Sequence, residues 1–174
     1  CIDVFSKRAW AVPLLNKSGD NVKRALEKIF EDAMPNMIQT DKGTEFLNST
    51  VQALFAAHNI KHYTSENEDI KAAIVERFNR TLKNKMWRYF TCSKSQKYID
   101  VLDELLASYN NTYHRSIGMA PSQVTDDKTQ EIVDKLYPPK LKPVYSFEIG
   151  DKVRISKGNH VFRKGYVQGW TDEI

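Results

Sequence analysis

The segment AIVERFNRTLKNKMWRYF, residues Ala73 to Phe90, separates its apolar and charged side chains into two faces at helical spacing. The apolar face recurs at steps of three and four residues: Val75, Phe78, Leu82, Met86 and Tyr89. This spacing predicts one amphipathic helix whose apolar face packs on a sheet. A second stripe carries one acid, two bases and an aromatic residue: Glu76, Arg80, Lys83 and Trp87. Because residues three and four apart share one side of a helix, this stripe suits a partner rich in phosphate.

An acid upstream of the helix gives Glu76 a partner for chemistry. Asp41 lies in IQTDKGTEF, at the end of a short apolar run, where a strand could hold its carboxylate against the face that carries Glu76. Each acid also has an ordinary structural interpretation. Glu76 and Arg80 fit a surface ion pair at i,i+4 spacing, worth a few tenths of a kcal/mol. Asp41 fits a cap on the turn before Gly43.

Length and charge restrict the class of protein. The chain has 174 residues, 41% of them apolar, which suits one domain of ordinary size with a smaller appendage. Its net charge is only +4, but between residues 71 and 90 six bases face one acid, which favours nucleic-acid binding by that stretch. No apolar run approaches the roughly 20 residues that cross a membrane, so no membrane partner is expected. The two cysteines, Cys1 and Cys92, form no CxxC pair and no zinc spacing with the histidines, so we expect reduced thiols in an intracellular protein.

Hydrophobic patterning predicts a mixed α/β domain over residues 1–115. Strands are expected at residues 1–5, 9–15, 37–40 and 60–63, the first two forming a hairpin around the turn at residues 6–8. Helices are expected at residues 18–32, 49–58, 73–90 and 94–113, with a loop at residues 64–70. This order of elements corresponds to a mixed sheet with helices on its faces.

The composition changes after Arg115. Residues 116–144 are predicted to be a connector with short helices at 122–124 and 129–136 and a stiff proline-rich linker at 138–143. Residues 145–174 alternate apolar and polar side chains between glycines, which predicts the start of a small antiparallel β module. Its bases Lys152 and Arg154 are candidate DNA contacts, although a charged, solvated surface is the alternative.

Asp41 and Glu76 are the candidate catalytic residues and metal ligands. Phosphodiester transfer needs an activated hydroxyl or water and stabilisation of developing charge, and two Mg²⁺ ions about 3.5 to 4 Å apart provide both. Mg²⁺ binds carboxylate oxygens and retains several waters, so a few acidic side chains suffice. The expected cofactor is therefore a pair of Mg²⁺ or Mn²⁺ ions.

Five motifs resemble, in the same order, the core and C-terminal module of retroviral-type integrases, with the nearest likeness to those of Polinton (Maverick) and gypsy-type elements. They are IDVFSKRAW, TDKGTEF, VERFNRTLKNKM, YNNTYHRSIGMAPSQV and FEIGDKVRISK. The resemblance implies an RNase H-like fold, an Asp-Asp-Glu triad that binds two metal ions, and an SH3-like module at the C-terminus. The second and third acids of that triad fall on Asp41 and Glu76. The family's DNA-contacting bases fall on Arg80 and Lys83, and Lys71 is a further candidate.

The first acid of the triad has no clear counterpart. Asp3 lies 38 residues before Asp41, which is shorter than the family's usual interval by about one strand and a turn. Asp3 matches instead an aspartate on the family's second strand, with an expected structural role as a buried acid that the turn at residues 6–8 satisfies. A catalytic Asp3 is the alternative. We therefore expect the first strand and its acid to precede Cys1, and the 174-residue chain alone to lack strand transfer.

The resemblance implies an integrase or transposase that cleaves the ends of a mobile element and joins the freed 3′-hydroxyl to target DNA. The expected partners are element and target DNA and further copies of the chain, as a dimer or tetramer, and the expected location is the nucleus. A plain nuclease is one rival. The other is a domesticated or decayed protein that binds DNA or a partner without catalysis.

Overall fold

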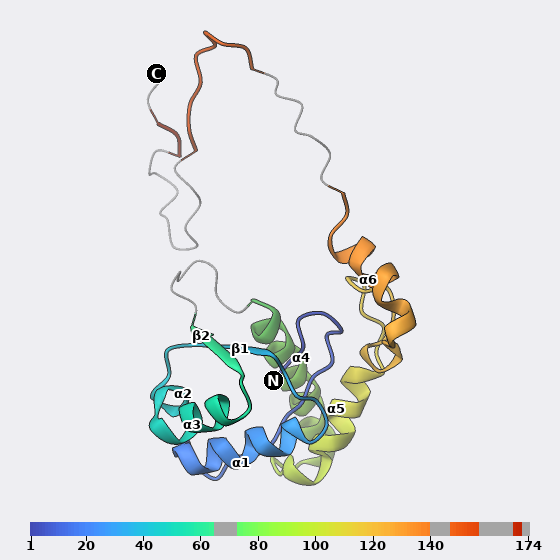
Figure 1. The fold of residues 1–174 in the computed structure, drawn as a ribbon. Helices are drawn as coiled ribbons and strands as arrows, with labels where there is room; N and C mark the ends of the chain where they lie inside the picture. Colours follow the sequence, from blue (N-terminus) through green and yellow to red (C-terminus); the bar gives the residue numbers. More distant parts are fainter. Residues whose placement is uncertain (65–72, 140–146, 157–168, 172–174) are drawn as a thin grey trace. The chain divides into compact units, whose positions relative to one another are not determined.

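The computed structural model describes residues 1–64, 73–139, 147–156 and 169–171. The chain divides into two compact units, Cys1–Pro138 and Pro139–Ile174, and the described helices and strands all belong to the first (Figure 1). None of the described helices is both long and apolar enough to cross a membrane. The division into core, connector and module at residues 116 and 145 stays a prediction.

The first ten residues form the expected hairpin, but with little strand structure. Ile2 and Ala9 make an antiparallel bridge, and the Asp3 N–H donates to the Arg8 carbonyl at 2.8 Å. Lys7 turns the chain with a φ of 61°. The strand expected over residues 9–15 does not form. Pro13 lacks an N–H for pairing, and residues 13–15 are exposed.

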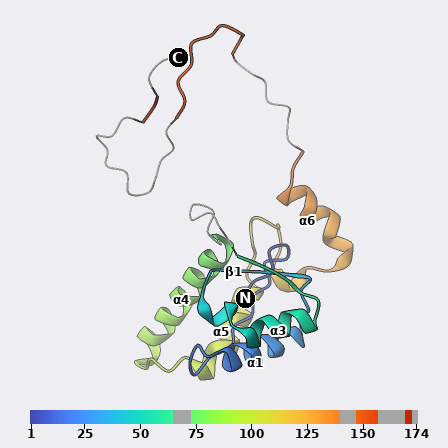
Figure 2. The same ribbon diagram turned by 60° about the vertical axis from the view of Figure 1, so that its left-hand side comes forward.

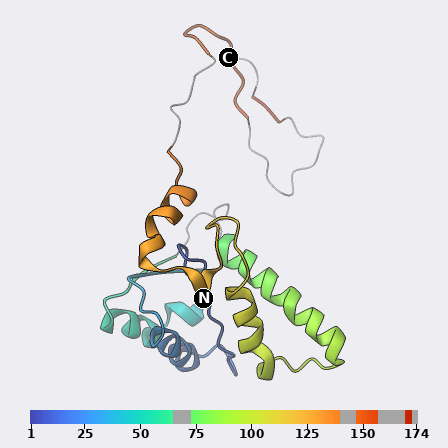
Figure 3. The same ribbon diagram turned by 90° about the vertical axis from the view of Figure 1, so that its right-hand side faces the viewer.

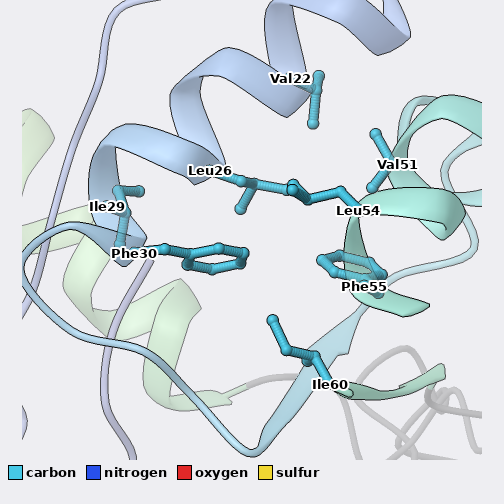
Figure 4. Packing of buried hydrophobic residues seen from close by; sticks show 8 residues of the cluster. All are labelled: Val22, Leu26, Ile29, Phe30, Val51, Leu54, Phe55 and Ile60. Carbon is cyan, nitrogen blue, oxygen red and sulfur yellow. The ribbon is translucent and has the colours of Figure 1, made fainter. Parts of the chain in front are cut away.

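Helix α1, Gly19–Phe30, begins where the sequence predicts and ends two residues earlier than expected. The Ser18 side chain accepts a hydrogen bond from the Asn21 N–H, which satisfies one free donor of the first turn. The buried face of α1 packs on helix α3, Ser49–Ala57, and forms the main core (Figure 4). The buried residues of this core are Val22, Leu26, Ile29, Phe30, Val51, Leu54, Phe55 and Ile60.

Strands β1, Met37–Thr40, and β2, Lys61–Thr64, pair in parallel, with Ile38 opposite His62 and Thr40 opposite Thr64. The short helix α2, Thr44–Leu47, and α3 make the crossover between them. In the described part of the chain the sheet has these two strands, so the expected mixed sheet is reduced to a parallel pair beside the hairpin bridge. Alternate residues of each strand are exposed, so both strands are half-buried.

Helix α4, Ala73–Ser93, is the helix that the opening segment predicts, and it runs three residues further. The next predicted helix, 94–113, is shorter than expected. Lys94 has a φ of 53°, which ends helical geometry, and the chain resumes as a 3₁₀ turn, Ile99–Val101, and helix α5, Leu102–Asn110.

Helices α4 and α5 pack on a second core formed by Ala9, Phe78 and Tyr109. The rings of Phe78 and Tyr109 meet edge to face, with centroids 4.9 Å apart. Figure 3 shows the α4–α5 pair, in green and yellow, on one side of the first unit and the α1–α3 pair, in blue and teal, on the other; Figure 2 shows α4 and α3 on opposite sides. Ala9 belongs to the second core, whereas Trp10 and Val12 pack on the main core. Successive residues of this segment therefore face opposite helix layers.

The rest of the first unit forms a third small core. The short 3₁₀ helices Pro121–Gln123 and Asp126–Lys128 lead to helix α6, Thr129–Leu136, whose bounds are those predicted. Ile117, Met119 and Ile132 are buried together, and Phe5 of the hairpin packs against them. Within the first unit, residues 116–136 are therefore joined to the N-terminal hairpin by apolar packing.

The second unit is described at Pro139 and over residues 147–156 and 169–171. Ser156 and Trp170 form an antiparallel bridge, and the Thr171 N–H donates to the Ile155 carbonyl at 2.9 Å. This pairing agrees with an antiparallel module, and the SH3-like assignment stays a prediction. Lys152 and Arg154 are exposed in this unit.

Candidate active site

Asp41 lies directly after β1, at the carboxyl end of the strand, and is exposed. Its Oδ1 accepts a hydrogen bond from the Gly43 N–H at 3.2 Å, so the turn cap that the sequence offered as an alternative is present. The other carboxylate oxygen, Oδ2, has no hydrogen-bond partner within the described residues. One oxygen thus holds the turn, and with respect to the described part of the chain the second is available to a ligand.

Two carboxylates approach Gly43 in this turn. A Cβ placed on Gly43 would lie 2.5 Å from Glu45 Oε2 and 3.0 Å from Asp41 Oδ1. Glu45 pairs with Lys17 at 3.1 Å. Its pKa is lowered, first by the hydrogen bond from its own backbone N–H and then by Lys17. Glu45 therefore adds a second negative charge beside Asp41.

Glu76 lies in the first turn of α4 and is exposed. An acid there is stabilised by the unpaired N–H groups of the helix start. The ordinary interpretation, an ion pair with Arg80, is not formed, since the ion pairs of the described residues do not include it. Among the described residues, the Glu76 carboxylate therefore has no ion-pair partner.

Exposed bases follow Glu76 along α4. Arg80 and Lys83 are exposed on the predicted stripe, and Trp87 beyond them is 61% exposed. Lys85 differs, because its Nζ donates to Ser108 Oγ on α5 at 2.7 Å. The predicted stripe thus presents an acid and two bases to solvent, while Lys85 connects α4 to α5.

Asp3 holds the hairpin turn. Its Oδ2 accepts from the Ser6 N–H at 2.8 Å and from the Ser6 hydroxyl at 2.5 Å, and Oδ1 accepts from the Phe5 N–H at 3.4 Å. The predicted partners are therefore confirmed. The predicted burial is wrong, since Asp3 is exposed, because the tight turn leaves the side chain on the outside of the hairpin. That Asp3 lies apart from Asp41 stays a prediction.

The donor chemistry of Asp41 and Glu76 fits Mg²⁺ or Mn²⁺, which prefer carboxylate oxygens. Within the described residues, no three His, Cys, Asp or Glu side chains gather as a metal-binding group. Lys71 lies outside the described residues, as does the expected loop at 65–70. The metal, catalytic and DNA-binding roles of the candidate residues stay predictions.

The sequence patterns did not reveal a series of side-chain hydrogen bonds that leads to Asp41. His62 on β2 lies between Gln52 of α3 and Thr40 of β1, at 2.9 Å from each. The Thr40 hydroxyl in turn donates to the Asp41 carbonyl at 2.7 Å. The alternation of β2, which turns His62 inward, was the signal available in the sequence.

Residues 1–69 match the family model of the integrase core domain. The chain is 39% identical over 178 residues to the transposon-derived protein F54H12.3 of Caenorhabditis elegans, covering 100% of this chain and 59% of the relative. It is 28% identical over 152 residues to the retrovirus-related Pol polyprotein from transposon 412 of Drosophila melanogaster, covering 83% of this chain and 12% of that protein. The chain thus spans less than two thirds of either relative.

Two solved structures share the fold. The integrase catalytic core domain of HTLV-2, solved with magnesium as a trimer, superposes with a TM-score of 0.61 at 22% identity, covering 70% of this chain and 79% of that one. A chain of the simian T-cell lymphotropic virus intasome, solved with the PP2A regulatory subunit B56 gamma, gives 0.65 at 17% identity, covering 99% of this chain and 59% of that one. Residues 1–69 therefore match the integrase core domain, and the chain has a fold like that of retroviral integrase catalytic cores.

Proposed function

We propose that this chain supplies catalytic residues of an integrase or transposase that cleaves DNA 3′-ends of a mobile element and joins them to target DNA. The observation that carries the proposal is the exposed Asp41 carboxylate at the end of β1, which has an oxygen free of partners in the described residues. Exposed Glu76 at the start of α4 is the second acid. The match of residues 1–69 to the integrase core domain supports the same reaction class.

Each group has a role in this reaction. Asp41 and Glu76 would hold two Mg²⁺ or Mn²⁺ ions, which activate the attacking oxygen and stabilise charge on the phosphate. Arg80 and Lys83 would bind DNA phosphates, which places the substrate without reading its sequence. Lys71, and Lys152 and Arg154 of the second unit, are further phosphate contacts in this proposal.

The proposed reaction has two steps. In the first, water attacks a phosphodiester near the element end, and breaking the P–O3′ bond leaves a free 3′-hydroxyl. In the second, that hydroxyl attacks a target phosphodiester, whose own 3′-oxygen leaves. Both steps pass through a phosphate with growing negative charge, which the cationic groups around Asp41 and Glu76 would stabilise.

The partners in this proposal are element DNA, target DNA and further copies of the chain, with action in the nucleus. The support for assembly is that related cores were solved in dimeric and trimeric forms, and a related chain within an intasome. A second candidate is a host protein that binds DNA without catalysis. The relative described as a transposon-derived protein favours it.

The test uses the full-length protein with labelled element-end DNA and Mg²⁺. Asp41→Asn and Glu76→Gln keep side-chain shape but remove a charged ligand, so both should abolish cleavage and joining while DNA affinity stays within about twofold, because charge attraction to phosphate needs no metal. Asp3→Asn is the matched control. It keeps an acceptor for Ser6 and should retain activity.

Three outcomes separate the candidates. Loss of reaction in the Asp41 and Glu76 variants alone supports the proposed site. An Asp41→Asn protein that still joins DNA ends removes Asp41 from the active site. A wild-type protein that binds DNA but never cuts or joins it supports the non-catalytic candidate.

A further inference from the structure

A chain of hydrogen bonds crosses three elements and ends at Asp41. It starts at Gln52 of α3, whose Nε2 donates to the Phe46 carbonyl at 2.8 Å and lies 2.9 Å from His62 Nδ1. His62 Nε2 lies 2.9 Å from the Thr40 hydroxyl. The Thr40 hydroxyl donates to the Asp41 carbonyl at 2.7 Å.

The chemistry of the groups fixes the direction of every bond in this chain. The Phe46 carbonyl can only accept, so it requires the amide nitrogen of Gln52, and that nitrogen must also donate to His62 Nδ1. His62 Nδ1 is then an acceptor, which leaves the ring proton on Nε2, facing Thr40. The Thr40 hydroxyl accepts a hydrogen bond from Nε2–H and donates its own to the Asp41 carbonyl. The chain is consistent only with a neutral imidazole protonated at Nε2.

The surroundings of His62 favour this neutral form. The ring is half-buried and lies on Phe55 of the main core, with centroids 5.0 Å apart. This burial lowers the pKa of His62. Because Phe55 is only 2% exposed, the imidazole rests on a packed surface and cannot shift without disturbing the core.

The chain of hydrogen bonds ends at Asp41, the candidate catalytic acid. The Thr40 bond holds the Asp41 carbonyl, and the Gly43 N–H holds Asp41 Oδ1, so both the backbone and one carboxylate oxygen are fixed. A metal-binding carboxylate must be held to within about 0.5 Å of its productive place. We propose that His62 is a positioning residue for Asp41, acting through Thr40 and held by Gln52. This inference rests on the proposed function.

The first test is NMR of the 174-residue chain, which requires no activity. The ring nitrogens of His62 should report the Nε2-protonated tautomer. Thr40→Val removes the hydroxyl but keeps the branched shape, so the backbone order parameters of Asp41 and Gly43 should fall from about 0.85 toward 0.6. Thr40→Ser, the matched control, should keep them. A proton on Nδ1, or an unchanged Asp41 in Thr40→Val, overturns the proposal.

The second test uses the full-length enzyme over a range of Mg²⁺ concentrations. Thr40→Val and His62→Leu should need about tenfold more Mg²⁺ for half-maximal joining, as expected when a support of a metal ligand is lost. DNA affinity should not change. Thr40→Ser should match the wild type, and His62→Gln, which can both accept and donate, should recover most of the loss.

The outcomes distinguish this proposal from the proposed function. Unchanged Mg²⁺ dependence in Thr40→Val overturns the positioning role even where the tautomer is as expected. Equal loss of DNA binding and of metal response shows a general structural role and also overturns it. A wild-type protein without any reaction refutes the proposed function, and the NMR result then decides by itself whether His62 fixes Asp41.

Discussion

Replacing Phe78 with alanine should detach the helix that carries Glu76. Phe78 is the one fully buried residue among the described side chains of α4, at 3% exposed. Its ring meets Tyr109 of α5 edge to face at 4.9 Å and an angle of 67°. Val75 and Leu82 pack beside it but are only partly buried. Phe78 is therefore the main apolar attachment of α4, next to the partly buried Val75 and Leu82 and the hydrogen bond from Lys85 to Ser108.

The structure sets the expected size of the effect. Truncation of a buried phenylalanine to alanine costs about 3–5 kcal/mol, of which the edge-to-face pair accounts for roughly 0.5–1.5. Domains of this size have a free energy of unfolding of about 5–15 kcal/mol, so Phe78→Ala removes a large share of it. With a urea m-value near 2 kcal/mol/M, the unfolding midpoint should fall by about 1.5–2.5 M.

Trp87→Ala is the matched control on the same helix. It removes a larger aromatic ring, but Trp87 is 61% exposed and meets Phe90 edge to face, with centroids 5.7 Å apart. Its loss should cost less than about 1 kcal/mol. Urea unfolding followed by circular dichroism measures both variants. A Phe78→Ala midpoint that falls no further than that of Trp87→Ala would refute the claim that this core holds α4.

Three further predictions follow from other contacts. Lys83→Ala should weaken DNA binding of the full-length protein and lower its salt slope by about one, whereas Lys85→Ala, tied to α5, should leave the slope unchanged. Burial, and then the nearby cations Lys7 and Arg77, lower the pKa of His114, so the unfolded chain binds more protons than the folded one below about pH 6.5. The free energy of unfolding should therefore fall from pH 7 to pH 5. Urea unfolding midpoints measured across this range should show the fall, and His114→Gln should reduce their dependence on pH. Asn110→Ala should cost about 2–4 kcal/mol in urea unfolding, because it leaves the Ala9 N–H and carbonyl, bonded at 2.9 and 3.0 Å, without their side-chain partner.

Local sequence patterns predicted the helices well. The Ser18 cap begins α1, the stripe from Ala73 gives the start of α4, and α6 has the predicted bounds Thr129–Leu136. These signals lie within a few residues of one another, so no distant contact is needed to interpret them. The failure at 94–98 has a local cause that patterning does not reveal, because the positive φ of Lys94 ends the helix.

The strands and the site depend on distant contacts and were predicted less completely. Patterning predicts a strand at residues 9–15, but pairing decides whether one forms, and of these residues only Ala9 has a bridge partner within the described part of the chain. Patterning likewise selected Asp41 as a candidate acid. It could not find the chain that supports Asp41, because that chain joins Thr40, Gln52 and His62 from three elements.

The two candidate acids are held by different cores, so their spacing depends on what joins those cores. Asp41 is tied to α3 and β2 of the main core, whereas Glu76 is carried by α4 on the second. The segment Ala9–Val12 contacts both, because Ala9 packs in the second core while Trp10 faces the main one. Asn110 binds Ala9 through two hydrogen bonds, and Asp32, just after α1, accepts the Trp10 indole N–H at 2.6 Å. Loss of the Asn110–Ala9 or the Asp32–Trp10 hydrogen bonds should therefore change the separation of the two carboxylates, although neither acid takes part in these bonds. The affinity of a metal site shared between the two acids should then fall under conditions in which the protein is still folded.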